Sequence, residues 1–216
     1  MTELHAFEPA PEPRPAPQRR SLLRARVTPV MLLLVILGII FFRLYVVEMA
    51  IVDGHSMDNT LHDGDRVLVL KFLGLKRFDV VLLTDPQTHS TAIKRIVGLP
   101  GDIISMVPRI VRAENSESIG GGQLYIDGKP YDEPWATSNL PTVMAPGKIR
   151  PGKYFVMGDN RDASVDSRTY KGVDRDRIYG VAVMVVFPFS HVRFITRKAY
   201  PTPAEAGIIT SDVRSD

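Results

Sequence analysis

Residues 91–102 have the sequence Thr91-Ala-Ile-Lys-Arg-Ile-Val-Gly-Leu-Pro-Gly-Asp102. Branched apolar residues recur over the first seven positions, and Gly, Pro and Asp follow at once. This pattern predicts a short β-strand that ends in a turn. Other short runs, also rich in branched and aromatic residues, predict further strands at Val67–Leu70, Val80–Leu83, Tyr154–Met157 and Tyr179–Phe187.

The segments between these strands also favour a mainly β fold. Leu124–Tyr131 predicts a hairpin, because an Asp-Gly pair such as Asp127-Gly128 suits the tight turn between antiparallel strands. No long amphipathic helical pattern follows residue 50. We therefore expect an antiparallel β-sheet domain with a small inserted β-hairpin subdomain. The insertion, residues 106–152, contains three consecutive glycines and several prolines, and we expect it to be less regular.

An apolar run precedes the predicted strands. Residues 30–42 are apolar without interruption, Arg43 follows, and residues 44–47 are apolar again. The whole stretch is about the ~20 residues that cross a bilayer as a helix. The alternative is a cleaved secretory signal, but no small-x-small site follows the run closely. The sequence therefore predicts one transmembrane helix over residues 29–47.

Charge and composition predict the arrangement on either side of this helix. Residues 1–28 are rich in Pro and Glu, then in Arg, which predicts a disordered tail. Because arginines favour the cytoplasmic side, the tail is expected in the cytoplasm. Residues 48–199 would then form an extracytoplasmic domain at the plasma membrane, and residues 200–216 a C-terminal tail.

Composition also excludes several kinds of site. The chain has no cysteine, and its five histidines lack the spacing of a helical zinc site, so we expect no metal and no cofactor. The net charge is only +3. Acidic and basic residues are mixed over residues 50–200, so no basic stripe predicts a nucleic-acid partner.

A catalytic serine would need a base. His55 directly precedes Ser56, and neighbouring side chains on an extended segment point to opposite faces, which makes His55 a poor base for Ser56. A lysine can act as base once it is desolvated. Lowering its pKa from about 10.4 to near neutrality takes on the order of 4 kcal/mol of differential interaction. The residues alone leave ordinary alternatives open: Ser56 as a turn residue, Lys94-Arg95 as a solvated basic pair, and residues 158–168 as an exposed loop or a Ca²⁺ loop.

Four polar segments nevertheless resemble, in order, the signature boxes of the bacterial type I signal peptidases, in their Gram-positive-type form with a single anchor. These segments are Gly-His-Ser-Met-x-x-Thr-Leu at 54–61, Gly-Asp-x-Val-x-Val at 64–69, Lys-Arg-Ile-Val-Gly-x-Pro-Gly-Asp at 94–102, and Gly-Asp-Asn-Arg-x-x-Ser-x-Asp-Ser-Arg at 158–168. The resemblance covers about residues 30–198.

The resemblance implies a membrane-bound serine endopeptidase with a Ser–Lys dyad. Ser56 would be the nucleophile, Lys94 the general base, and the Ser56 backbone N–H the donor to the oxyanion. Ser164 would hydrogen-bond the lysine amine, and Asp166 and Arg168 would form a supporting ion pair. Gly54 stands where some relatives carry a serine that supplies a further oxyanion donor. Asn59 stands where the family often has proline, which would fix the backbone φ angle.

The resemblance also implies the substrate. The enzyme would cleave signal peptides from secreted precursor proteins after an Ala-x-Ala-like site. Residues 50–54 and 91–94 would flank the extended substrate, and candidate pocket residues are Val52, Met57, Leu61 and Ile93. The expected partners are the precursors, the lipid bilayer and the secretion translocon.

Two other functions share some of these features. Ser–Lys self-cleaving regulators similar to the SOS-repressor autoproteases also carry a Gly-Asp-x-Val strand, but they have a DNA-binding domain, for which residues 1–48 leave no room. A non-catalytic, membrane-anchored binding module is the other alternative. The joint presence of Ser56, Lys94, Ser164 and Asp166 argues against it.

Overall fold

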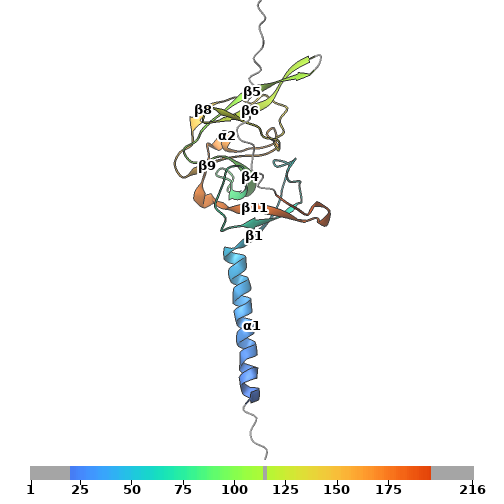
Figure 1. Ribbon diagram of the computed structural model, residues 1–216, viewed down its shortest axis with the longest axis vertical. Helices are drawn as coiled ribbons and strands as arrows, with labels where there is room; N and C mark the ends of the chain where they lie inside the picture. Colours follow the sequence, from blue (N-terminus) through green and yellow to red (C-terminus); the bar gives the residue numbers. More distant parts are fainter. Residues whose placement is uncertain (1–19, 114–115, 196–216) are drawn as a thin grey trace, which may run out of the picture. The chain divides into compact units, whose positions relative to one another are not determined.

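The computed structural model describes residues 20–113 and 116–195 (Figure 1). The chain divides into two compact units, residues 1–42 and residues 43–216. The predicted C-terminal tail lies outside the described residues, as do residues 1–19.

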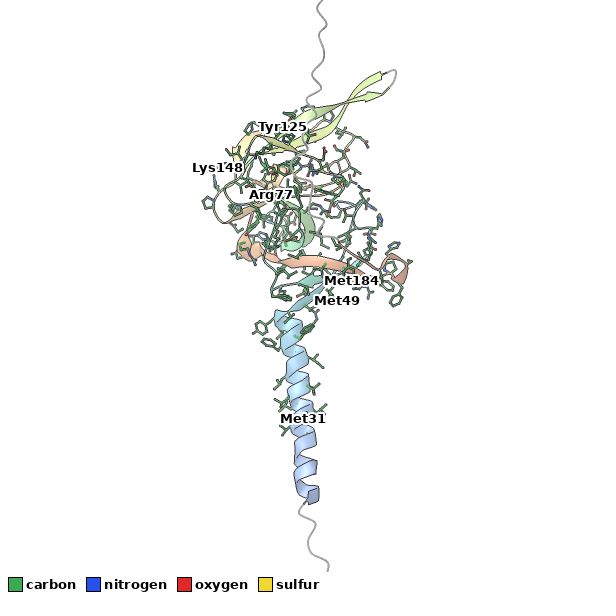
Figure 2. All side chains as sticks on the ribbon, viewed as in Figure 1. Met31, Met49, Arg77, Tyr125, Lys148 and Met184 are labelled. Atoms are coloured by element: carbon green, nitrogen blue, oxygen red, sulfur yellow. The ribbon has the colours of Figure 1, made fainter. Side chains whose placement is uncertain are left out.

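Helix α1 spans Arg20–Tyr45. Residues 20–28, which we expected to be part of a disordered tail, are therefore helical. The segment contains Leu, Arg and Ala, which are good helix formers, and neither Pro nor Gly. The apolar side chains from Val30 onward are exposed, and Figure 2 shows Met31 pointing away from the helix axis. Within the described ranges, no helix combines the length and apolar character needed to cross a membrane.

The main sheet of the second unit has eight strands. The strand order is β1-β2-β11-β3-β4-β9-β10, with β12 paired to β11, and every pairing is antiparallel. Its strands are β1 (Val47–Ile51), β2 (Arg66–Leu70), β3 (Val80–Thr84), β4 (Thr91–Gly98), β9 (Lys153–Met157), β10 (Val173–Asp174), β11 (Ile178–Phe187) and β12 (Arg193–Phe194).

Short helical segments lie between the last strands. They are α2 (Ser167–Tyr170), η1 (Arg175–Arg177) and η2 (Phe189–His191). Each of the five predicted strands lies within β2, β3, β4, β9 or β11, so the mainly β prediction is confirmed.

A second antiparallel sheet holds the order β7-β6-β5-β8. Its strands are β5 (Ile103–Ala113), β6 (Ser116–Ile126), β7 (Lys129–Tyr131) and β8 (Met144–Lys148). The predicted hairpin is confirmed: Ile126 pairs with Lys129, and both turn residues have positive φ, as this tight turn requires.

The prediction that residues 106–152 are less regular missed the long β5–β6 ladder, which projects from the second unit in Figure 1. Pro108 and the glycines of β6 weaken a strand pattern. The ladder accommodates them with a register shift between Pro108 and Arg109.

The core consists of three clusters of buried apolar side chains. The first lies between β1, β2, β4 and the loop after β1, and it includes Met57 and Leu61 from that loop. The second joins the two sheets around Trp135, with Phe78 and Met157. Burial of Met57 and Leu61 holds the loop after β1 against the sheet, and this loop carries Ser56.

Strand β11 passes very close to β2 at Gly180. A Cβ atom at this position would lie 2.5 Å from the Leu70 carbonyl oxygen and 2.9 Å from its carbonyl carbon. Both atoms belong to the backbone of a central strand, so they cannot move away cheaply. Glycine is therefore needed here for packing.

We expect Gly180→Ala to lower the free energy of unfolding of the full chain by about 1–3 kcal/mol, because the added methyl group overpacks the sheet. Gly147→Ala is the matched control, since a Cβ there would meet nothing closer than 3.9 Å, and its effect should stay within about 0.5 kcal/mol. Urea unfolding followed by the fluorescence of Trp135, the single tryptophan, measures both. Equal urea midpoints for the two variants would contradict the close approach.

Candidate active site

The side chains of Ser56 and Lys94 meet beside the first core cluster. Ser56 lies in the loop after β1, and Lys94 lies in the middle of β4, paired with Val81 of β3. The Lys94 Nζ atom is 2.6 Å from Ser56 Oγ, at hydrogen-bond distance. The loop turns at Gly54, whose φ is +82° and whose N–H donates to Asp63 Oδ1 at 2.8 Å. The structure thus brings together the two residues predicted to form the dyad.

Lys94 is buried, with 6% of its surface exposed. Burial lowers the pKa of its amine below the ordinary value of 10.5, since an ammonium group loses its hydration there. The negative charges of Asp166 and Asp85 oppose this shift of the Lys94 pKa, and the positive charge of Arg168 adds to it. Among the described residues, no carboxylate forms an ion pair with Lys94. A serine hydroxyl beside such an amine has the geometry of a nucleophile and its base.

The predicted ion pair between Asp166 and Arg168 is present. The Arg168 Nε and Nη2 atoms donate to the two carboxylate oxygens, each at 2.8 Å. Asp166 is fully buried and also accepts the Gly158 N–H at 3.1 Å. Arg168 Nη2 donates further to the carbonyl oxygens of Arg161 and Ser164. The pair therefore holds the whole loop of residues 158–168 in one conformation beside Lys94.

Ser164 differs from the expectation. Its hydroxyl is buried and has no hydrogen-bond partner in the described part of the chain, so the expected bond to the Lys94 amine is absent. The side chain packs instead against Gly158, where a Cβ atom would clash with the Ser164 side chain and lie 2.5 Å from the Ser56 carbonyl oxygen. Ser164 thus lies beside the loop after β1 that carries Ser56, which we call the serine loop. Its hydroxyl does not hydrogen-bond the Lys94 amine.

The backbone N–H of Ser56 is available as a donor. None of the hydrogen bonds formed among residues 20–113 and 116–195 uses it. The Ser56 carbonyl, in contrast, accepts the N–H of Asn160 at 3.1 Å. A free N–H at this position can donate to an oxyanion, which is the role that the family resemblance implies for it.

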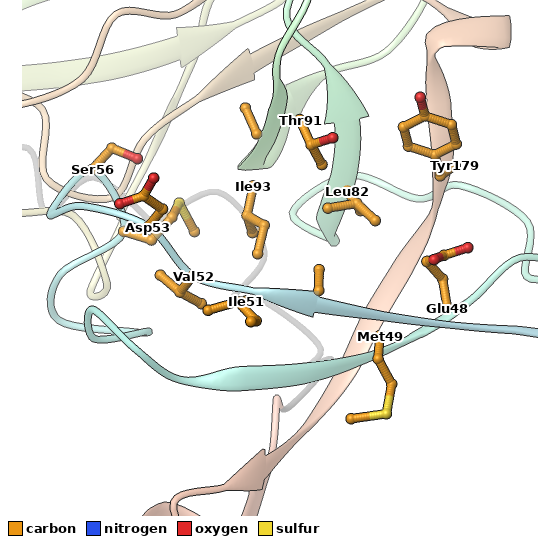
Figure 3. A pocket seen from close by; sticks show the side chains of 13 residues that line it. Glu48, Met49, Ile51, Val52, Asp53, Ser56, Leu82, Thr91, Ile93 and Tyr179 are labelled. Atoms are coloured by element: carbon orange, nitrogen blue, oxygen red, sulfur yellow. The ribbon is translucent and has the colours of Figure 1, made fainter.

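A groove of about 550 Å³ begins at Ser56 and runs between β1 and β4 (Figure 3). β1 is the edge strand of the sheet, and β9 pairs with β4 only from Arg95 onward, so residues 91–94 also present a free edge. The groove is lined by Glu48, Met49, Ala50, Ile51, Val52, Asp53, Ser56, Met57, Leu82, Thr91, Ala92, Ile93 and Tyr179.

Three of the four predicted pocket residues, Val52, Met57 and Ile93, line this groove. The fourth prediction, Leu61, was wrong. Its side chain is completely buried in the first core cluster and does not line the groove. Leu61 instead packs in the core with Met57 of the same loop.

Known proteins resemble this chain over most of its length. The family model of signal peptidase, peptidase S26, matches residues 24–187. Signal peptidase I of Bacillus licheniformis is 37% identical over 169 residues, which cover 71% of this chain and 84% of the relative. The chain belongs to the signal peptidase family, peptidase S26. Members of this family are serine endopeptidases.

A further relative and a solved structure are also signal peptidases I. Signal peptidase I T of Bacillus subtilis (strain 168) is 35% identical over 177 residues, which cover 75% of this chain and 85% of the relative. A crystal structure of signal peptidase I from Enterococcus faecalis V583 is 25% identical, with a TM-score of 0.37, and covers 50% of this chain and 97% of that one.

Sequence reasoning missed a buried polar network beside the candidate site. Arg95 points to the opposite face from Lys94 and binds both carboxylate oxygens of Asp159, at 2.8 and 2.6 Å. Its guanidinium lies 4.7 Å from the centre of the Trp135 ring. Asp159 also accepts the hydroxyl of Thr60. The network joins β4, the serine loop and the loop of residues 158–168, so Lys94-Arg95 is not a solvated pair.

Asn59 holds the serine loop in a way that proline could not. Its φ is +87°, outside the range near −65° that proline allows, whereas asparagine tolerates positive φ better than most residues. Its Nδ2 atom donates to the Trp135 carbonyl oxygen at 2.8 Å. A side-chain hydrogen bond therefore fixes this loop where the family often has a proline.

The Lys94 environment predicts a pH effect for Asp85→Asn. The Asp85 charge raises the Lys94 pKa, so its removal should lower that pKa further and shift the acid limb of the kcat/KM profile to lower pH. Asp85 Oδ1 accepts the N–H groups of Gln87 and Thr88 at 2.8 and 2.9 Å, which an asparagine oxygen can also accept, so the turn is kept.

The matched control is Asp176→Asn, because this exposed residue is not among the charges that act on Lys94. The control should leave the acid limb in place. A shift of the Asp85→Asn limb to higher pH, or no shift, would show that Lys94 does not determine the acid limb.

Proposed function

We propose that this chain is a membrane-bound serine endopeptidase that removes N-terminal signal peptides from secreted precursor proteins through a Ser–Lys dyad. The observation that carries the proposal is the 2.6 Å contact between Ser56 Oγ and the buried Lys94 Nζ, at one end of a groove between two free strand edges. The family assignment supports the class of reaction, and the proposed steps are assigned to Ser56 and Lys94.

In the proposed mechanism, neutral Lys94 accepts the proton of the Ser56 hydroxyl while Oγ attacks the scissile carbonyl carbon. The oxyanion that forms receives a hydrogen bond from the Ser56 N–H. Lys94 then gives its proton to the leaving amine, and an acyl-enzyme on Ser56 remains. A water molecule, deprotonated by Lys94, attacks the ester carbonyl carbon. As the bond to Ser56 Oγ breaks, Lys94 returns this proton to Oγ, and the acyl group leaves as the carboxylic acid. Acylation and deacylation each begin with neutral Lys94, so activity rises as the pH rises through its lowered pKa.

The strand edges support binding of an extended peptide. Val52 donates its N–H to Asp65 and accepts the N–H of Gly64, so its backbone bonds toward the β2 side. Because bonding direction alternates along an antiparallel edge, Met49 and Ile51 direct their backbone groups toward the groove. A substrate strand could pair with these groups and with the free edge of residues 91–94.

The groove walls support a preference for small side chains at two substrate positions. Val52, Met57 and Ile93 are themselves nearly buried and line the groove beside Ser56. We infer that their apolar surface contacts small substrate side chains such as a methyl group. This agrees with cleavage after an Ala-x-Ala-like site, with the two alanines facing the groove floor.

We also propose that α1 anchors the enzyme in the plasma membrane, with the peptidase unit outside the cytoplasm and beside the translocon. Over its described residues, α1 is not long and apolar enough to cross a membrane. The proposal rests on the apolar side chains of residues 30–42, which lie exposed along the helix, and on the arginines that precede them. External protease should digest the peptidase unit in intact spheroplasts. Protection of this unit until the cells are lysed would reverse the proposed orientation.

The dyad is tested by cleavage of a secretory precursor with an Ala-x-Ala site by the detergent-solubilised full chain. We expect Ser56→Ala and Lys94→Met each to reduce turnover by about three orders of magnitude or more, since each removes one half of a joint mechanism. Lys129→Met, on the distant β6–β7 hairpin, is the matched control and should cleave at the normal rate. If Lys94→Met were as active as this control, Lys94 could not be the base.

A further inference from the structure

Asp53 places an unpaired negative charge at the catalytic end of the groove. Figure 3 shows Asp53 and Ser56 at one end, and Glu48 and Tyr179 at the other. Glu48 is bound to Lys71 at 2.7 Å and lies beside Arg43 at 3.5 Å. The exposed carboxylate of Asp53, in contrast, forms no hydrogen bond or ion pair with any described residue.

Neighbouring charges do not neutralise Asp53. The nearest histidine in sequence, His55, lies 3.1 Å from the carboxylate of Asp58. Asp63 accepts the Gly54 N–H and is a further negative charge of the same loop. The charge of Asp53 therefore remains available to a molecule that binds in the groove.

The alternation of side chains along β1 indicates which substrate residue meets this charge. Ala50 and Val52 face the core, whereas Ile51 and Asp53 are exposed on the opposite face. A substrate strand that pairs with β1 has its side chains on the same two faces. If the two small residues of the Ala-x-Ala site face the core beside Val52, the middle residue is on the exposed face with Asp53.

We propose that Asp53 selects the charge of this middle residue, favouring Lys or Arg over Asp or Glu. The inference rests on the proposed function and adds a specificity determinant to the same groove. Since the carboxylate is exposed, the expected preference is modest, about fivefold in kcat/KM for Lys over Glu at low salt. It should weaken as the ionic strength rises, because exposed charges are screened.

The test uses three precursors that differ only in the middle residue of the cleavage site, which is Gln, Lys or Glu. Detergent-solubilised full chain is compared as wild type, Asp53→Asn, Asp53→Lys and the exposed control Asp132→Asn, which lies outside the groove. The ratio of the Lys rate to the Glu rate should be about five in the wild type and the control. It should fall to about one in Asp53→Asn and below one in Asp53→Lys.

Equal rates for the Lys and Glu precursors with the wild type, at a normal rate for the Gln precursor, would overturn the role of Asp53 and leave the proposed function intact. A ratio that Asp53→Asn does not change would overturn it as well. If the wild type cleaved none of the three precursors, the proposed function itself would fail.

Discussion

The burial of the Lys94 amine is the physical constraint on which the site depends. Removing an ammonium group from water costs several kcal/mol unless a counter-charge compensates it. Most buried lysines are therefore paired, but Lys94 contacts the neutral hydroxyl of Ser56. The same burial that disfavours the charged form lowers the Lys94 pKa, which is the direction that a base requires.

Lys94 remains without an ion-pair partner among the described residues because each carboxylate near it is bound to another group. Asp166 is held by Arg168, Asp159 by Arg95, and Asp85 by the N–H groups of its own turn. Each charge is thus fixed at a distance from the amine. The two ion pairs also join the loop of residues 158–168 to itself and to β4. The environment of Lys94 in the candidate site therefore depends on how the surrounding charges are paired.

The strands and the tight hairpin could be predicted from local sequence, because branched residues and Asp-Gly turns act over a few positions. The contact between Ser56 and Lys94 could not, since it joins segments 38 residues apart, and only the family resemblance supplied it. Two predictions, Leu61 as a pocket residue and Ser164 as a partner of the lysine amine, differ from the structure for a related reason. Leu61 and Ser164 belong to the right segments, but whether a side chain faces the groove, the core or the amine depends on tertiary packing.

Long-range packing also explains what sequence reasoning missed. Arg95 looks like a solvated neighbour of Lys94, yet it is buried against Asp159 and Trp135, which lie 64 and 40 positions away in the chain. The β5–β6 ladder was missed because proline and glycine weaken its pattern, although its register tolerates both.

The most direct measurement of the central claim is the titration of the Lys94 amine itself. NMR of the full chain labelled with ¹⁵N-lysine would follow each Nζ signal against pH, and the signal absent from Lys94→Met identifies Lys94. Our account predicts that this signal titrates at a lower pH than the exposed lysines, below the ordinary value of 10.5. A Lys94 signal that titrates together with the exposed lysines would contradict it.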